Sequence, residues 1–272
     1  MLDSVSTTAR PDSWAAAEAY GPYMGRWSAL VACQFIEWLA LPRSGHWLDV
    51  GCGTGALTQA ILARAEPAEV TGIDPSDRYI AFAQSRHADR RAGFRTGDAQ
   101  ALPVADASQD AVVSGLVLNF VTCPARAAAE MKRVLRPGGT AAAYVWDYAG
   151  RMQLLRYFWD AAAALNPATR ALDEGQRFPL CHVHRLRDLF ADAGFVEIDC
   201  RAFDVPTVFR DFDDLWSPFL GGQGPAPTYC GTLVEEPRAA LRERLRAALP
   251  IAADGTISLV ARAFAVRGVR TR

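Results

Sequence analysis

Residues 46–55, with the sequence His-Trp-Leu-Asp-Val-Gly-Cys-Gly-Thr-Gly, constrain the possible folds of this chain more than any other segment. They combine an apolar run, an acidic residue near its end and three glycines at alternating positions. Leu57, Ile61 and Leu62 then share one face at helical spacing. A strand that enters a helix through a glycine loop brings backbone N–H groups close to a ligand. The segment therefore predicts an α/β fold with a ligand-binding loop at residues 51–55.

Two kinds of ligand fit this loop. Gly51, Gly53 and Ala56 satisfy the G-x-G-x-x-G/A pattern of dinucleotide-binding proteins. Asp74 ends the next apolar strand, roughly 20 residues after the glycines, where a carboxylate binds ribose hydroxyls. Asp49, in contrast, would repel a phosphate and attract a cation. S-adenosylmethionine, with its ammonium and sulfonium groups, is such a cationic ligand. The loop alone leaves both ligands open.

Three further blocks follow in the next part of the chain. Residues 94–103 predict a third strand that ends in Gly-Asp, and residues 109–121 a fourth strand that opens into an apolar turn. Residues 130–140 predict a helix that closes on Pro137-Gly138-Gly139 and leads into a fifth strand at 141–146. Together with the glycine loop, these blocks resemble the class I S-adenosylmethionine-dependent methyltransferases of the ubiquinone/menaquinone-biosynthesis type. The resemblance favours a methyltransferase over an NAD(P)-dependent oxidoreductase, which stays as an alternative.

The resemblance implies an α/β, Rossmann-like, seven-stranded sheet of order 3-2-1-4-5-7-6 with a helical cap, in a single domain spanning residues 1–272. Residues 46–147 would form the cofactor-binding core. Residues 13–41, 148–182 and 206–255 would form the cap and bind the substrate. The implied reaction is methyl transfer to an oxygen, nitrogen or carbon nucleophile of a small-molecule acceptor, with S-adenosylhomocysteine as product. An adenosylmethionine-binding protein without methyl transfer is a second alternative.

The resemblance also assigns cofactor-binding roles to residues of this chain. Asp49 would bind the ammonium, Asp74 the ribose and Asp98 the adenine amino group, while Tyr23 and Arg26 would close over the cofactor and meet its carboxylate. The full set of expected cofactor-binding residues is Tyr23, Arg26, Asp49, Gly51, Cys52, Gly53, Gly55, Asp74, Pro75, Ser76, Gly97, Asp98, Ala99, Gln100, Gly115 and Leu116.

Candidates for acid–base or substrate-orienting roles are fewer. Asn119 follows the fourth strand, and Asp147 follows the fifth. His182 and His184 alternate beside Cys181, and a histidine can act as a base near neutral pH. No second ligand pair accompanies these histidines, so we expect no metal site. An aromatic stripe at helical spacing (Phe209, Phe212, Trp216 and Phe219) is consistent with either core or pocket.

Charge and composition limit the remaining possibilities. The chain has 29 basic and 30 acidic residues, which argues against a nucleic-acid partner. Six scattered cysteines indicate reduced thiols. The amino-terminal residues lack the apolar segment of a signal peptide, and no apolar run approaches the roughly 18 residues that span a bilayer. We therefore expect a cytoplasmic protein with no membrane partner. The oligomeric state stays open, with a homodimer as one alternative.

Overall fold

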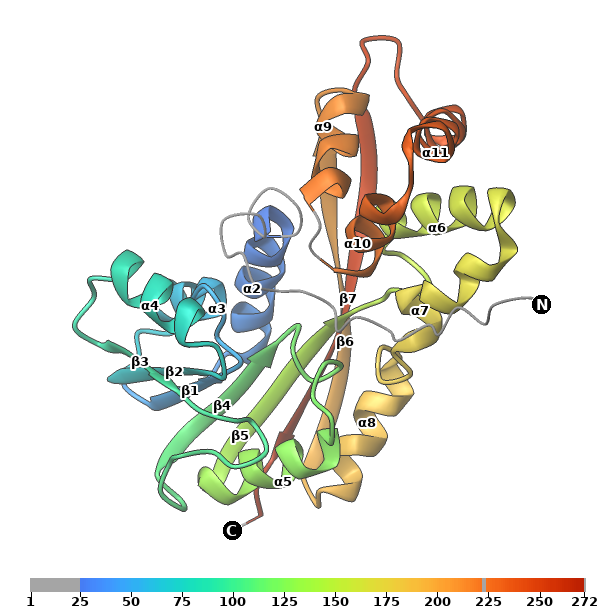
Figure 1. Cartoon of the computed structure of the whole chain (residues 1–272). Helices are drawn as coiled ribbons and strands as arrows, with labels where there is room; N and C mark the ends of the chain where they lie inside the picture. The colour runs from blue at the N-terminus through green and yellow to red at the C-terminus, as the bar shows by residue number, and fades with distance from the viewer. Residues whose placement is uncertain (1–24, 222–223, 272) are drawn as a thin grey trace.

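A computed structural model describes residues 25–221 and 224–271, in which seven strands form one sheet (Figure 1). The strand order is β3-β2-β1-β4-β5-β7-β6, which confirms the predicted topology. Strands β1 to β5 pair in parallel and β7 runs antiparallel between β5 and β6. The strands are β1 (His46–Val50), β2 (Glu69–Asp74), β3 (Ala92–Thr96), β4 (Gln109–Gly115), β5 (Leu135–Trp146), β6 (Val196–Phe209) and β7 (Ile257–Val269).

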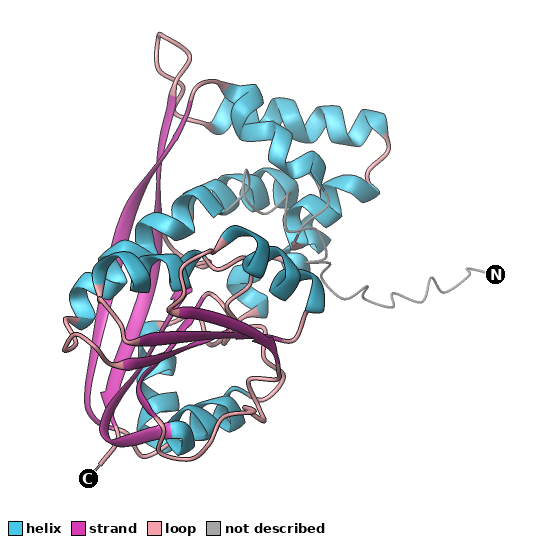
Figure 2. Ribbon diagram, turned by 90° about the vertical axis from the view of Figure 1, so that its left-hand side faces the viewer, coloured by secondary structure: helices cyan, strands magenta, loops and turns pink. Residues whose placement is uncertain are grey.

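Helices cover both faces of the sheet, as the burial of parallel strands requires (Figure 2). Helix α2 (Arg26–Leu39) packs beside α3 (Ala56–Arg64), and α5 (Pro124–Val134) packs beside α8 (Val183–Asp192). Helix α4 (Asp77–Arg86) packs against β2 and β3. Trp27, Val31 and Phe35 form the buried face of α2, and Leu30 lies outside it and is 45% exposed. None of the described helices has the length and apolar character needed to cross a membrane.

The predicted cap segments 148–182 and 206–255 lie together at one end of the molecule (Figure 1). They contain α6 (Gln153–Leu165), η2 (Pro167–Leu172), α7 (Glu174–Arg177), α9 (Phe212–Trp216), η3 (Ser217–Gly221), α10 (Pro225–Thr232) and α11 (Glu235–Ala248). The rings of Phe158 and Phe219 stack with centroids 4.4 Å apart and join the two segments. All four aromatic residues of the stripe at 209–219 are buried, so this stripe is core. Strand β6 extends to Phe209 and takes the first residues of the 206–255 segment.

The junction between α5 and β5 differs from the sequence prediction. The helix ends at Val134 and β5 begins at Leu135, so Pro137, Gly138 and Gly139 belong to the strand. A residue before proline is biased toward extended backbone, which ends the helix early. The backbone then pairs with β7: Gly138 N–H donates to the Arg270 carbonyl, and Arg270 N–H donates to the Gly139 carbonyl, both at 2.9 Å.

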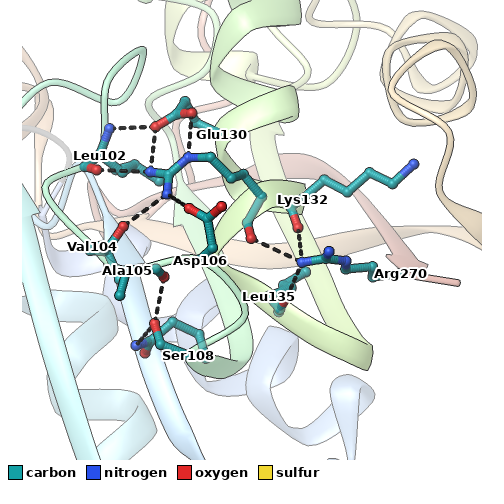
Figure 3. A network of polar contacts seen from close by, with 11 residues as sticks. Leu102, Val104, Ala105, Asp106, Ser108, Glu130, Lys132, Leu135 and Arg270 are labelled. Atoms are coloured by element: carbon teal, nitrogen blue, oxygen red, sulfur yellow. Dashed lines mark hydrogen bonds and ion pairs between the residues drawn. The ribbon is translucent and has the colours of Figure 1, made fainter. Parts of the chain in front are cut away.

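Two arginines fix the carboxyl end of α5 (Figure 3). The Arg270 guanidinium donates to the carbonyls of Lys132 and Arg133 at 3.1 and 2.9 Å, and also to that of Leu135. These carbonyls have no partner within the helix, so a cation there satisfies them and opposes the helix dipole. Arg133 donates to the carbonyls of Leu102 and Val104 at 2.9 and 3.0 Å. The helix end therefore holds both the last strand and the loop after β3.

We expect Arg270→Met to lower the free energy of unfolding by about 1–3 kcal/mol, since it keeps the apolar stem and removes a charged donor from partly buried carbonyls. Urea denaturation followed by circular dichroism measures the change. Arg244→Met, on the exposed face of α11, is the matched control and should stay within about 0.5 kcal/mol of the parent. Equal stability of the two variants would show that Arg270 contributes nothing to this junction.

Candidate cofactor site

The glycine loop leaves β1 at the carboxyl edge of the sheet and turns at once over β2. The N–H groups of Gly51 and Cys52 both donate to the Ile73 carbonyl, at 2.7 and 3.0 Å. Strand β1 pairs in register with β2, with Val50 opposite Ile73. Because parallel strands end at one edge, Asp49 and Asp74 lie close together there, as the sequence predicts.

The three loop glycines have positive φ angles of 77°, 51° and 88°, but their surroundings differ. A Cβ at Gly51 would lie 2.5 Å from the Val117 side chain, and one at Gly55 would lie 2.3 Å from His87 Nε2. A Cβ at Gly53 would meet no atom within 4 Å among residues 25–221 and 224–271. Gly53 is therefore the glycine whose missing side chain leaves open space for a ligand, while Gly51 and Gly55 make room for neighbouring protein side chains.

The two carboxylate oxygens of Asp49 are buried, and among residues 25–221 and 224–271 only one of them has a hydrogen-bond partner. Its side chain is fully buried, and the Thr58 hydroxyl donates to Oδ2 at 2.7 Å. Oδ1 has no hydrogen-bond partner among the residues that the structure describes. Burial raises the pKa of the Asp49 carboxyl to about 7. A buried acceptor without a donor is costly, so this oxygen fits the ammonium group of adenosylmethionine.

Asp74 holds the loop as well as facing the ligand edge. Its Oδ2 accepts from the Gly53 N–H at 3.0 Å and its Oδ1 accepts from the Ser76 N–H at 2.9 Å. Burial raises the pKa of this carboxyl, and the two N–H donors oppose the shift. The Ser76 hydroxyl accepts from the Tyr79 N–H at 3.4 Å, so Ser76 is the N-cap of α4. Pro75 lies between these two ligand-edge residues.

The loop after β3 continues the same edge. Gly97 N–H donates to the Asp74 carbonyl at 3.1 Å, which places Asp98 directly after the pairing of β2 and β3. Asp98 Oδ1 accepts from the Gln100 N–H at 2.9 Å, and Gln100 Oε1 accepts from the Cys123 N–H at 3.0 Å. Ala99 is buried between them. These contacts give the loop a fixed shape beside the end of β2.

Several other residues that were expected to bind the cofactor make contacts within the protein itself. Leu116 has a positive φ of 63° and its N–H donates to the Tyr144 carbonyl at 2.8 Å. A Cβ at Gly115 would lie 2.6 Å from the Tyr144 hydroxyl. The Cys52 thiol lies against Gly72, and burial raises its pKa, so it is packed into the sheet. Tyr23 lies outside the described residues, and of Arg26 the structure describes only the backbone at the start of α2.

The candidate acid–base residues occupy three different settings. The Asp147 carboxylate is buried and accepts from the N–H groups of Gly150 and Arg151, both at 2.9 Å. The rings of His182 and His184 stack with centroids 5.5 Å apart at the start of α8. Asn119 Nδ2 is buried, with no hydrogen-bond partner in the described part of the chain. Within residues 25–221 and 224–271, no group of three or more His, Cys, Asp or Glu side chains is placed to hold a metal ion.

Sequence reasoning missed the side chains that support the site from behind. Thr58 bonds to Asp49, while Val117 and His87 crowd the loop glycines; Thr58 and His87 lie outside the blocks that carry the resemblance, and Val117 lies in the 109–121 block without an expected role. Glu130 was quoted only as the start of a helix block, but its Oε2 accepts from the Leu102 N–H at 2.8 Å and so fixes the end of the loop after β3. Only the helical position of Thr58, nine residues after Asp49, could have pointed to such a partner.

Comparisons with known proteins agree with this geometry. Residues 48–143 match the family described as "Methyltransferase domain". The ubiquinone/menaquinone biosynthesis C-methyltransferase UbiE of Desulfotalea psychrophila is 32% identical over 194 residues, which cover 67% of this chain and 77% of that protein. The protein of the same name from Paracoccus denitrificans is 44% identical over 110 residues, or 38% of this chain and 43% of that one.

A solved structure shares the fold at lower identity. Haemonchus contortus phosphoethanolamine N-methyltransferase 2, in complex with phosphomonomethylethanolamine and S-adenosylhomocysteine, superposes with a TM-score of 0.59 at 15% identity, over 94% of this chain and 57% of that one.

Most of the matches to curated relatives cover less than half of the length of the relative. Apart from the Desulfotalea protein, seven curated relatives are covered over only 22–44% of their length. All eight are named as methyltransferases or as a biotin-biosynthesis protein, and none as a nicotinamide oxidoreductase. S-adenosylmethionine is accordingly the cofactor, and the oxidoreductase alternative has no support. The chain belongs to the class I S-adenosylmethionine-dependent methyltransferases, in the group that includes the ubiquinone/menaquinone-biosynthesis enzymes.

Proposed function

We propose that this protein transfers the methyl group of S-adenosylmethionine to an oxygen, nitrogen or carbon nucleophile of a small molecule in the cytoplasm, and releases S-adenosylhomocysteine. The observation that carries the proposal is an aromatic cluster, Phe120, Tyr148 and Phe178, where the cap meets the strand ends. We refer to it as the mouth cluster. It lies on the loops after β4 and β5, at the same sheet edge as Asp49 and Asp74.

The mouth cluster joins three segments that are far apart in the sequence. Phe178 directly follows α7. Its ring centroid lies 5.0 Å from that of Phe120, with an interplanar angle of 76°, and 5.7 Å from that of Tyr148, with an interplanar angle of 43°. Phe120 is 37% exposed, so the cluster is accessible from one side. Aromatic walls supply apolar contact with a polar handle at the tyrosine. An acceptor that enters here would meet an apolar surface beside the cofactor edge.

Such a surface suits methyl transfer. The bound cofactor supplies a methyl carbon that carries part of a sulfonium charge, and this charge is lost on transfer. An apolar surrounding favours the loss of charge. Holding the nucleophile in line with that carbon at about 3 Å supplies much of the rate acceleration. The residues around the mouth therefore act mainly by orienting the acceptor and excluding water.

The residues that could act as a base differ in the contacts that they already make, and these contacts rank them. Asp147 already accepts from two backbone N–H groups, and these bonds fix the loop after β5. We propose a loop-stabilising role for it ahead of a basic one. His182 and His184 are partly exposed at the start of α8 and keep a basic role as a hypothesis. Asn119 cannot take a proton, and we propose that it orients the acceptor.

The names of the relatives do not identify the acceptor of this chain. Their names include C-methyltransferases of quinone biosynthesis and malonyl-[acyl-carrier protein] O-methyltransferases, so both carbon and oxygen acceptors occur among them. The direct test incubates the purified protein with methyl-labelled adenosylmethionine and a panel of phenols, carboxylates, amines and activated carbons. Acceptor-dependent release of S-adenosylhomocysteine supports the proposal. Tight cofactor binding without turnover on any class would favour the adenosylmethionine-binding alternative, and sedimentation on the same samples tests for a homodimer.

Asn119→Leu separates a role in acceptor binding from a role in the fold. Its buried Nδ2 lacks a partner in residues 25–221 and 224–271, so an apolar side chain of similar size should raise the free energy of unfolding by about 1 kcal/mol. The same change should lower kcat/KM for the acceptor by roughly tenfold or more, with the cofactor affinity unchanged. Asn166→Ala, an exposed cap position, is the control and should leave kcat/KM unchanged. Unaltered acceptor kinetics in Asn119→Leu would exclude the orienting role.

Cofactor affinity should depend on pH through Asp49. Burial raises the pKa of this carboxyl from 3.8 to about 7, so the free protein holds it protonated in mild acid. An ammonium ligand binds the ionised form. Affinity for S-adenosylhomocysteine should therefore rise as pH increases from about 5 to about 7, by at most about tenfold per unit, and then level off. The effect on folding has the opposite sign. The Asp49 carboxyl ionises at lower pH in the unfolded chain than in the folded protein, so the free energy of unfolding of the free protein falls as pH rises over the same range.

Titration calorimetry at several pH values measures this dependence, and buffers of different ionisation enthalpy reveal the released proton. Asp49→Asn is the control, because it keeps the shape and the Thr58 contact but has no proton to lose. Its affinity should be lower at pH 8 and nearly independent of pH. The same slope in parent and Asp49→Asn would assign the titrating group elsewhere.

A further inference from the structure

We infer that His87 is a positioning residue that holds the glycine loop in the conformation that binds the cofactor. His87 directly follows α4 and belongs to no motif of the family. Its Nε2 lies 3.3 Å from the Thr54 carbonyl oxygen, and its Nδ1 lies 3.1 Å from Gln59 Oε1. One ring thus bridges the loop, through Thr54, and the first turn of α3, through Gln59.

The roles of the two nitrogens follow from their partners. A carbonyl oxygen can only accept, so Nε2 carries the proton in the contact with Thr54. The Gln59 side-chain amide offers both a donor and an acceptor to Nδ1. The ring is also fixed from the sheet side by Phe94 of β3, whose centroid lies 5.4 Å from its own. The imidazole is therefore held on three sides by separate elements.

Steric contact makes the bridge specific to this loop conformation. A Cβ at Gly55 would lie 2.3 Å from His87 Nε2 and 2.8 Å from its Cδ2, so the ring occupies the space that any other residue at 55 would need. Gly55 is buried and is the left-handed N-cap of α3. The glycine at this position serves close approach of the protein's own histidine.

The opposite side of the loop is fastened to β2. Ile73 accepts from the N–H groups of Gly51 and Cys52, and Asp74 accepts from the N–H of Gly53. The segment 51–55 is thus clamped between β2 on one side and His87 on the other. Gly53, in the middle, keeps the open space for the cofactor. Without His87 the loop would keep its bonds to β2 and its own bonds at Gly55, whose N–H donates to the Cys52 carbonyl at 2.8 Å and whose carbonyl accepts from the Gln59 N–H at 2.9 Å. The Thr54 carbonyl would lose its contact with the ring, so the segment around Thr54 could leave the binding shape.

The test uses cofactor binding alone, without an acceptor. The inference rests on the cofactor assignment of the family and not on the proposed acceptor chemistry, so it can fail while methyl transfer stands, and the reverse. Calorimetric titration with S-adenosylhomocysteine compares the parent with His87→Ala, His87→Gln and His87→Asn. We expect His87→Ala to weaken binding roughly three- to thirtyfold, the range for one or two lost neutral hydrogen bonds.

The two amide variants separate the two contacts. A glutamine amide can reach the place of Nε2 and donate to Thr54, whereas an asparagine amide can replace only Nδ1. His87→Gln should recover most of the affinity and His87→Asn little of it. If only His87→Asn recovered the cofactor affinity, the contact with Gln59 and not the contact with Thr54 would be responsible, and the loop-positioning inference would be overturned.

A double-mutant cycle tests the steric contact. Gly55→Ala should weaken binding through both its φ of 88° and the clash with the ring. In the His87→Ala background the clash is gone, so Gly55→Ala should cost several-fold less. Gly53→Ala is the matched control: it meets no described atom within 4 Å, so its effect comes from its φ of 51° and from the ligand and should be equal in both backgrounds.

Folding is checked by thermal unfolding of each ligand-free variant. If Gly55→Ala does not fold, the comparison of His87→Ala, His87→Gln and His87→Asn decides alone. With an acceptor in hand, the KM for the cofactor should rise in His87→Ala while kcat at saturating cofactor stays within about twofold. Unchanged affinity in His87→Ala, or equal losses from Gly55→Ala in both backgrounds, would overturn the inference.

Discussion

The carbonyl of Ile73 is the point on which the cofactor site depends. By accepting from both Gly51 and Cys52, it forces the chain to leave β1 and turn over the end of β2 within two residues. Parallel pairing of β1 with β2 and β4 fixes the height of this turn at the sheet edge. The acidic residues at the ends of β1 and β2 then share one edge with the loop after β3. The site is thus a consequence of register, because the ligand-edge residues come from the ends of paired strands.

Polar groups at this edge are left incomplete in the protein itself. Asp49 Oδ1 and Asn119 Nδ2 are both buried without a partner among the described residues. Other buried groups are paired: the Trp159 indole N–H donates to the buried Glu174 carboxylate, and the Ser114 hydroxyl donates to the Val50 carbonyl at 2.8 Å. Burial raises the pKa of Glu174 to about 7, yet its bond to Trp159 serves to join α6 and α7. Arg156 Nε, Thr207 Oγ1 and Thr228 Oγ1 also lack a partner among the described residues, but they lie on α6, β6 and α10. Asp49 and Asn119 differ from them in position, since they lie at or just after the ends of β1 and β4, where a bound ligand can supply the missing partners.

The cap is held mainly by aromatic and cationic contacts. Phe158 stacks on Phe219 across the two cap segments, and Trp159 lies 5.9 Å from Tyr229 of α10. Arg242 and Arg246 of α11 lie over the Phe212 ring at 5.1 and 4.4 Å, and Arg242 pairs with Asp213 at 2.8 Å. The arginines of α11, which a charge pattern alone would assign to a solvated face, therefore include two that fasten α11 to α9. In the mouth cluster, Phe178 of the cap segment 148–182 contacts Phe120 at the sheet edge.

The glycine loop and the carboxylates at 49, 74 and 98 could be located from the sequence, because each follows a short-range pattern of an apolar strand, a turn residue and a helix start. The strand order was implied only by the family resemblance that these patterns carry, and the structure confirms it. The sequence could not determine which side chains stand behind those patterns. His87 and Thr58 lie outside the blocks that carry the resemblance, and Glu130 lies in one of them without a signal for its role. Their contacts arise only when the sheet brings these elements together. The sequence also placed the end of α5 too late, since the pairing of Gly138 and Gly139 with Arg270 spans nearly half of the chain. Long-range pairing and side-chain packing, which have no local signal, were decided by the tertiary structure alone.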